Sequence, residues 1–275
     1  MGAEYLARKA DELRLQTLDM VFAAQSGHIA PAFSIAEIIT VLYFRILRLK
    51  RSDPKWQGRD RFVLSKGHGC AALYAVLADL GFFPKKDLSS FRQLGSHLQG
   101  HPKTSTPGVE VSTGPLGIGA SVACGLALGG SRFGKFSVYA LLSDGEPDAG
   151  IVWEAALFAS HHRLANLTFI IDRNDMQYTG PTEAILALEP LNEKWRSFGW
   201  EVKEVDGHDV QSLIDVFSQR LTGFPRVVLA HTIKGKGVSF MENVAKWHGT
   251  APNENEYHAA RRELLTRLGS AATSA

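Results

Sequence analysis

Two polar side chains stand at the ends of two apolar segments. Asp144 follows the run FSVYALLS, and Asn174 ends the run NLTFIIDRN. A spacing of about 30 residues is typical of one strand–helix–strand unit. The carboxyl ends of parallel strands meet at one edge of a sheet, in the crevice where open α/β sheets bind ligands. We therefore expect both side chains to reach the same crevice, although Asx residues also end strands and cap turns without any ligand.

A carboxylate and an amide oxygen together make a hard, oxygen-only site with little protein charge. Mg²⁺ prefers such sites and completes its octahedron with substrate phosphates and water. Met176, two residues after Asn174, can add its backbone carbonyl. Gly145 lets the backbone approach a phosphate closely, and the amides that open the next helix attract the same anion. The pattern therefore predicts a site that binds a diphosphate through a metal ion.

The elements around these residues alternate between strand and helix. This alternation predicts an α/β fold, with a parallel sheet, right-handed crossovers and helices on both faces. Ser34 and Glu37 have the spacing of a capping box that opens a helix. Residues 95–119, rich in Gly, Pro, Ser and Thr, predict a long functional loop. The predicted strands are 61–65, 136–143, 166–172, 201–205 and 226–233, and the predicted helices are 3–25, 71–80, 121–130, 149–162, 190–198, about 209–221 and the tail from 254.

Bulk composition excludes several classes of partner. The chain has 275 residues, 45% of them hydrophobic and 21% charged, with a formal net charge of +2. This balance predicts neither a nucleic-acid surface nor a membrane surface. No segment approaches the roughly 20 apolar residues that a membrane span needs. Two cysteines, Cys70 and Cys124, provide no disulfide framework and suit a reducing compartment. We expect a soluble, cytoplasmic protein.

Five stretches in the same order resemble the transketolase family. They are SGHIAPAFSIAEIITVLYF, DRFVLSKGHGCAALYAVLADLGFF, LQGHPKTSTPGVEVSTGPLGIG, the DGE…N pair that holds Asp144 and Asn174, and KGKGVSFMEN…WHG. Together they span residues 20 to 250. The DGE…N pair resembles the thiamine-diphosphate motif of that family. The resemblance implies the thiamine-diphosphate-binding fold over residues 1–275 as a single diphosphate-binding domain.

The resemblance also implies a role for individual residues. Asp144, Asn174 and the Met176 carbonyl would bind Mg²⁺ or Ca²⁺, and Gly145 would contact the diphosphate. His68 and His248 would touch the cofactor as well as take part in the reaction. The other implied cofactor contacts are Gly114, Pro115 and Leu116 of the GPLG turn, Ile185, Asn174 and Lys234.

Four histidines match the active-site set of the family: His28, His68, His101 and His248. Imidazoles titrate near neutrality and can exchange protons with the hydroxyls of a sugar. Such proton transfer is worth roughly 10²- to 10⁴-fold in rate. The remaining histidines are expected to be structural or exposed, except that His208 and His231 could also lie near the site.

The resemblance implies a partner chain. Full-length relatives carry a pyrimidine-binding domain and a C-terminal domain, which hold the catalytic glutamate and the arginines of the substrate phosphate site. We expect them on a separate C-terminal subunit, with the cofactor between the chains and an α2β2 heterotetramer. Ala149 replaces a glutamate of the family's carboxylate relay, whereas Glu154 keeps the second relay position. Communication between active sites is therefore in doubt.

The leading hypothesis is a transketolase subunit that transfers a two-carbon ketol unit between sugars or sugar phosphates. The altered relay position also permits a specialised pathway. One alternative is a subunit of a thiamine-diphosphate-dependent enzyme that decarboxylates 2-oxo acids. Another alternative is a non-catalytic, partner-binding subunit.

Overall fold

One sheet organises the structure, a computed structural model that describes residues 1–134, 136–220 and 222–273. Its strands are β1 (Arg61–Leu64), β2 (Val138–Ser143), β3 (Leu167–Arg173), β4 (Glu201–Asp206) and β5 (Arg226–His231). All neighbouring strands are parallel, in the order β1-β2-β3-β5-β4. These strands confirm the predicted α/β fold and its parallel sheet.

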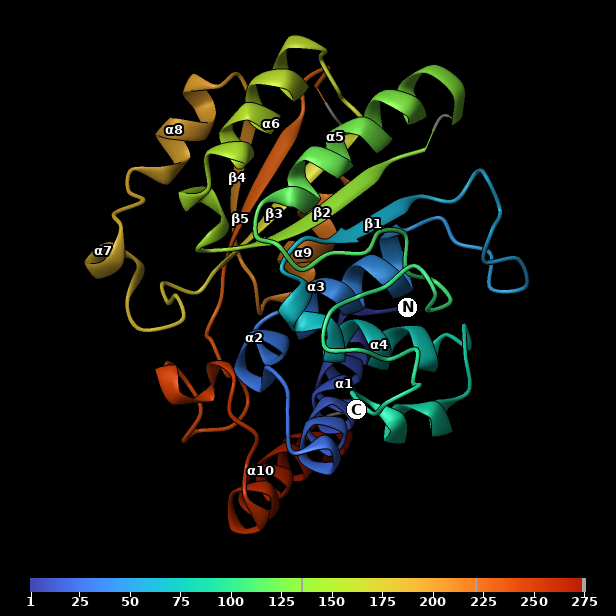
Figure 1. Ribbon diagram of the computed structural model, residues 1–275, viewed down its shortest axis with the longest axis vertical. Helices are drawn as coiled ribbons and strands as arrows, with labels where there is room; N and C mark the ends of the chain where they lie inside the picture. The colour runs from blue at the N-terminus through green and yellow to red at the C-terminus, as the bar shows by residue number, and fades with distance from the viewer. Residues whose placement is uncertain (135, 221, 274–275) are drawn as a thin grey trace.

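Helices cover both faces of the sheet, as predicted (Figure 1). One face carries α5 (Ile118–Gly129), α6 (Gly150–His161) and α8 (Leu191–Ser197). The other carries α1 (Ala3–Ala24), α2 (Ile29–Phe33), α3 (Ala36–Val41), α4 (Cys70–Asp79), α9 (Val210–Ser218) and α10 (Glu254–Thr273). The short α7 (Thr182–Ile185) lies in the segment after β3. Single turns of 3-10 or π-helix occupy Leu42–Ile46, Gly67–Gly69, Lys85–Ser90, Gly130–Gly134, Glu146–Asp148 and Ala245–His248.

The central strands are buried on both faces, which explains why they are apolar throughout rather than alternating. Leu141 and Ile170 pack into the core under α1–α4. Their neighbours Leu142 and Ile171 pack into the core under α5, α6 and α8. The sheet thus separates two hydrophobic cores.

The order of the strands predicts a ligand site at the carboxyl ends of β3 and β5. The chain leaves β3 for α8 on one face, and leaves β5 for α10 on the other face. Neighbouring strands whose chains leave in opposite directions open a gap at their carboxyl ends, where doubly wound sheets bind ligands. Asn174 follows β3 and Lys234 follows β5, so both lie at this gap.

The predicted capping box at Ser34 and Glu37 is wrong. Ser34 ends α2, and α3 begins two residues later without a side-chain cap. Both side chains are buried and are used elsewhere, because Ser34 Oγ donates to Asp172 and Glu37 accepts from Arg14. Tertiary contacts have replaced the local capping interaction.

The remaining boundaries differ little from the predictions. Residues 92–117 hold turns but no helix or strand, which confirms the long loop, and α5 then starts three residues earlier than predicted. The helix predicted to reach residue 221 ends at Ser218, and Leu221 lies outside the described residues. No helix within the described ranges is long and apolar enough to cross a membrane.

Candidate active site

A cavity of about 310 Å³ opens at the carboxyl ends of β2 and β3 and beside the loop after β5. Seven residues that the sequence singled out line it together with five others. The singled-out lining residues are His68, Leu116, Gly145, Asn174, Met176, Lys234 and His248, and the others are Pro31, Lys66, Ser143, Gln177 and Tyr178.

Asp144 lies directly behind this cavity and is fully buried. One carboxylate oxygen accepts a hydrogen bond from the Asn174 backbone N–H at 2.7 Å, and the other accepts from Arg173 at 3.2 Å. Burial raises the pKa of Asp144 to about 7, although Arg173 favours its charged form. The two residues predicted from strand spacing therefore do meet at one edge of the sheet.

The amide of Asn174 is held in one orientation by Asp172. Asn174 Nδ2 donates to the Asp172 carboxylate at 2.9 Å, which leaves Asn174 Oδ1 to accept from the Met176 N–H at 3.2 Å. The carbonyl side of the amide therefore faces Met176. Asp172 is in turn paired with Lys66, whose ammonium also donates to the Pro31 carbonyl at 3.0 Å.

Glu146 ties three parts of the site together. Its buried carboxylate accepts from the Gly117 N–H at 2.9 Å, from the Ser143 N–H at 2.7 Å and from the Ser65 hydroxyl. These donors come from the GPLG turn, the end of β2 and the end of β1. Gly117 has a φ of +82°, and a Cβ there would lie 2.6 Å from Ile151, so the turn requires glycine.

The histidines predicted from separate motifs form one cluster. The His28 ring lies 5.4 Å from His68, 5.4 Å from His248 and 6.2 Å from His101, measured between ring centroids. His68 and His248 line the cavity, and their rings lie 5.2 Å apart, so that they form a triangle with His28. His101, which is exposed, lies beside His28, and the structure thus brings all four together in one cluster.

These imidazoles are neutral at neutral pH. Burial, followed by the charges of Arg92 and neighbouring groups, lowers the pKa of His28 to about 4. Burial likewise lowers the pKa of His248 to about 3, and it lowers the pKa values of His68 and His101. Each neutral ring carries one N–H donor and one acceptor nitrogen. Among the described residues, the Nδ1 atoms of His28 and His248 are buried without a hydrogen-bond partner.

Lys234 enters the cavity from the loop after β5. Its ammonium donates to the Gln177 carbonyl at 2.8 Å and to the Met176 carbonyl at 3.4 Å. Burial and the nearby Lys66 lower its pKa to about 8. Lys234 therefore places an ammonium group beside the cavity, next to the Lys66–Asp172 pair, which favours an anionic ligand.

Some predicted residues lie outside the cavity lining. Ile185 is 44% exposed on α7. Glu154 lies on α6, in a separate groove with Phe158 that faces α5. Within the GPLG turn, Gly114 lies near the His101 ring and Pro115 is exposed, and neither lines the cavity.

Sequence reasoning missed Lys66, Asp172, Arg173 and Glu146. Two of them had a usable signal, because Lys66 directly precedes the matched GHG and Glu146 is the third letter of DGE. Asp172 and Arg173 resemble the ordinary polar end of an apolar strand. Their roles depend on partners far away in the sequence, such as Lys66 for Asp172.

The fold and the cavity are those of a cofactor-binding α/β domain. Similarity to known proteins identifies the family to which this domain belongs. The chain belongs to the transketolase family, because residues 6–268 match its thiamine diphosphate binding domain. One of its relatives, named as a subunit of the apulose-4-phosphate transketolase of Phocaeicola vulgatus, is 39% identical over 98% of this chain and 96% of that protein. The 6-deoxy-6-sulfo-D-fructose transketolase subunit of a Clostridium species is 41% identical over 94% of this chain and 96% of its own length.

A solved structure shows the same domain within a longer chain. The transketolase of Campylobacter jejuni superposes with a TM-score of 0.89 at 33% identity, over 96% of this chain but only 43% of that one. The present chain therefore spans less than half of the length of that transketolase, whereas it spans nearly all of the two subunit relatives.

Proposed function

We propose that this chain is the N-terminal subunit of a two-chain transketolase that depends on thiamine diphosphate and transfers a two-carbon ketol unit from a ketose to an aldose. The observation that carries the proposal is the meeting of four histidines beside a cavity that also receives Asn174, Met176 and Lys234. End-to-end similarity to two relatives named as transketolase subunits supports the division into two chains.

The residues at the cavity fit the diphosphate end of the cofactor. Lys66 and Lys234 supply positive charge, and Gly145 leaves its backbone open, since a Cβ there would meet nothing closer than Gln177 at 3.5 Å. The carbonyl side of Asn174 and the buried carboxylate of Asp144 stand together behind them. A divalent cation, Mg²⁺ or Ca²⁺, would offset the cost of burying Asp144 and would take Asn174 Oδ1 and the Met176 carbonyl as further oxygen ligands.

When bound, thiamine diphosphate supplies the carbon nucleophile and the electron sink that cleavage of a carbon–carbon bond requires. The chain itself supplies orientation and proton transfer. His68 and His248 lie at the cavity, His28 lies beside both of them, and His101 lies beside His28. A sugar chain has several hydroxyls, and this cluster offers several neutral imidazoles to bind them.

A second chain is needed to complete the reaction. We propose that it provides the pyrimidine-binding domain with its catalytic glutamate and the site for a substrate phosphate, in an α2β2 heterotetramer. Leu116 supports this proposal because it lines the cavity and is nevertheless 51% exposed. The two buried free thiols, Cys70 and Cys124, suit the reducing cytoplasm. The proposed substrates are sugars or sugar phosphates, a class that is supported by the names of the two relatives, which mention a phosphorylated and a sulfonated sugar.

The direct experiment measures ketol transfer by the chain alone and by the chain with its partner. The isolated chain should show negligible transfer in the presence of thiamine diphosphate and Mg²⁺, and the assembled complex should be active. Full activity of the isolated chain would refute the two-chain proposal. Decarboxylation of a 2-oxo acid without ketol transfer would favour the alternative enzyme class instead.

A further inference from the structure

The turn after β4 packs tightly against the end of β5. Its sequence is Asp206-Gly207-His208. The His208 N–H donates to Asp206 Oδ1 at 2.8 Å, and the Gly207 N–H donates to the His231 carbonyl at 2.7 Å. A Cβ on Gly207 would come within 2.4 Å of the Thr232 side chain. Only glycine therefore allows the turn to approach this closely, and the approach brings the imidazole of His208 over the loop that follows β5.

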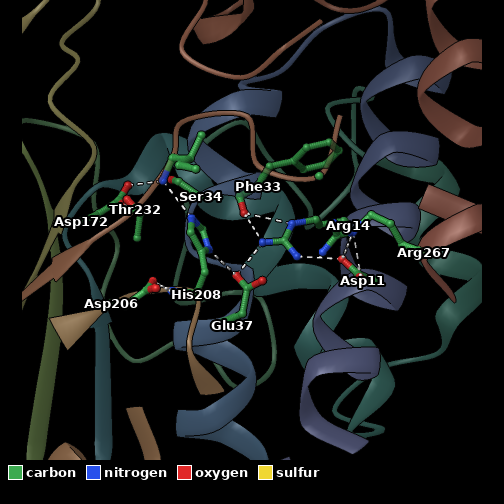
Figure 2. A network of polar contacts seen from close by, with 12 residues as sticks. Asp11, Arg14, Phe33, Ser34, Glu37, Asp172, Asp206, His208, Thr232 and Arg267 are labelled. Carbon is green, nitrogen blue, oxygen red and sulfur yellow. Dashed lines mark hydrogen bonds and ion pairs between the residues drawn. The ribbon is translucent and has the colours of Figure 1, made fainter. Parts of the chain in front are cut away.

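The imidazole of His208 joins that loop to a buried acid. Its Nε2 accepts a hydrogen bond from the Ile233 N–H at 2.8 Å, and its Nδ1 lies 3.1 Å from a carboxylate oxygen of Glu37 (Figure 2). Since Nε2 accepts, Nδ1 must carry the proton that is given to Glu37. Burial alone would raise the pKa of Glu37, but Arg14 and His208 lower it to about 2. Glu37 is therefore an ionised acceptor that selects this tautomer.

Glu37 is itself fixed by a network that crosses the helical layer. Arg14 on α1 is fully buried and donates to Glu37, to the Phe33 carbonyl at 3.1 Å and to Asp11 at 2.9 Å. Asp11 also accepts from Arg267 on α10 at 3.2 Å (Figure 2). His208 is thus fixed through Glu37 by residues of helices α1, α2, α3 and α10. Its ring cannot move without breaking buried polar contacts.

Ile233 directly precedes Lys234, the lysine that enters the cavity from this loop. A second contact holds the residue before it, because Thr232 Oγ1 donates to Asp172. Resting on the proposed function above, we propose that His208 is a positioning residue, which fixes the backbone at Ile233 and thereby places the ammonium of Lys234 for the diphosphate of the cofactor. The Asp206-Gly207-His208 turn thus has a structural role that its sequence alone did not predict.

His231 offers a matched control two residues before Ile233. Its ring pairs with Glu204 at 3.2 Å, but its side chain is 53% exposed and it contacts neither Ile233 nor Glu37 in the described structure. His231→Phe therefore removes an imidazole from the same region without touching the network. His208→Phe keeps the ring volume and removes both nitrogens, and His208→Ala serves as a second variant if the larger ring does not fold.

The first measurement is hydrogen exchange of the full chain without cofactor, followed over the peptide that covers 229–240. His208→Phe should accelerate exchange in this segment by about tenfold, since the Ile233 amide loses its acceptor. His231→Phe should leave it unchanged. Exchange that is unchanged in both His208 variants would overturn the proposal, because the loop would then be held without the imidazole.

The second measurement is the affinity of the assembled complex for thiamine diphosphate with Mg²⁺, in a double-mutant cycle. His208→Phe should weaken binding about 10- to 100-fold, the usual effect of losing a group that orients a ligand-binding residue. In a Lys234→Met background, the same change should cost little, because both variants remove the same interaction. Additive losses would mean that His208 stabilises the fold without acting through Lys234.

The wild-type complex separates this proposal from the proposed function. If the wild type binds thiamine diphosphate and the His208 variants bind it equally well, only the positioning role is refuted. If the wild type itself does not bind thiamine diphosphate, the proposed function and the positioning role are both refuted.

Discussion

Replacing Lys66 with methionine should destabilise the chain strongly. The Lys66 ammonium pairs with the Asp172 carboxylate, and the two side chains are 1% and 0% exposed. Methionine preserves most of the aliphatic packing but leaves the carboxylate buried without a counter-charge. Breaking a buried pair in this way costs about 3–5 kcal/mol in free energy of unfolding. Lys66→Met therefore tests how much the buried ion pair between the residues that follow β1 and the end of β3 contributes to stability.

The lower end of that range is expected here. Asp172 keeps hydrogen bonds from Ser34 at 2.7 Å, from Asn174 at 2.9 Å and from Thr232. These donors partly stabilise the unpaired carboxylate, so we expect a loss of about 3 kcal/mol. The assay is equilibrium unfolding in urea, with the midpoint and the slope compared between variants. Asp172→Asn added to Lys66→Met removes the unpaired charge and should restore at least half of the loss.

Lys85 provides the matched control, since it also pairs with an aspartate, Asp79, but its side chain is 59% exposed. If Lys66→Met cost no more than Lys85→Met, the buried carboxylate would not carry the expected desolvation penalty and the reasoning would be refuted. Failure of the double variant to recover stability would contradict it equally.

Three further predictions concern the site. Glu146→Gln replaces one of the two carboxylate oxygens with an NH2 group, which then opposes either the Gly117 N–H or the Ser143 N–H, and urea unfolding should show a loss of about 1–3 kcal/mol, whereas an unchanged midpoint would contradict the tie between the three loops. The pKa values of His28 and His248 in the folded chain lie below the usual 6.5, so the unfolded chain binds more protons and the free energy of unfolding should fall as pH decreases from about 6.5 to 4. The double variant His28→Asn/His248→Asn should show a shallower dependence of stability on pH. A pH dependence equal to that of the wild type would argue against neutral imidazoles in the folded chain. His101→Ala should lower turnover in the assembled complex more than cofactor affinity, and the reverse would make it a structural residue.

β1, β2, β3 and β5 were predictable because each lies within an apolar segment, whereas β4 is the largely charged EVKEVD. Leu167–Arg173 is buried throughout, and its continuous apolar run could only suit a central strand. The order of the sheet was not predictable in the same way. β5 inserts between β3 and β4, and although the apolar run of β5 suits a central strand and the charged β4 suits an edge, neither pattern specifies which strands pair with each other.

The site was predicted where its residues follow strands or stand in family motifs. Asp144 and Asn174 met because parallel strands share an edge, and the four histidines met as the resemblance implied. Lys66 was missed because a lysine is normally expected at the surface, and its partner is 106 residues away. Glu37 was misread as part of a helix cap for the same reason, since Arg14 and His208 are distant in sequence.

In the proposed function, Asp144 anchors the diphosphate of the cofactor at the edge of this sheet through a divalent cation. The most direct measurement is the thiamine diphosphate retained by the assembled complex after gel filtration in Mg²⁺, for the wild type and for Asp144→Ala, with Glu154→Ala as a control outside the cavity. The wild type should retain the cofactor, Asp144→Ala should lose it, and Glu254→Ala, which alters a carboxylate that is 82% exposed at the start of α10, should retain it as a second control. Equal retention by Asp144→Ala would contradict the account.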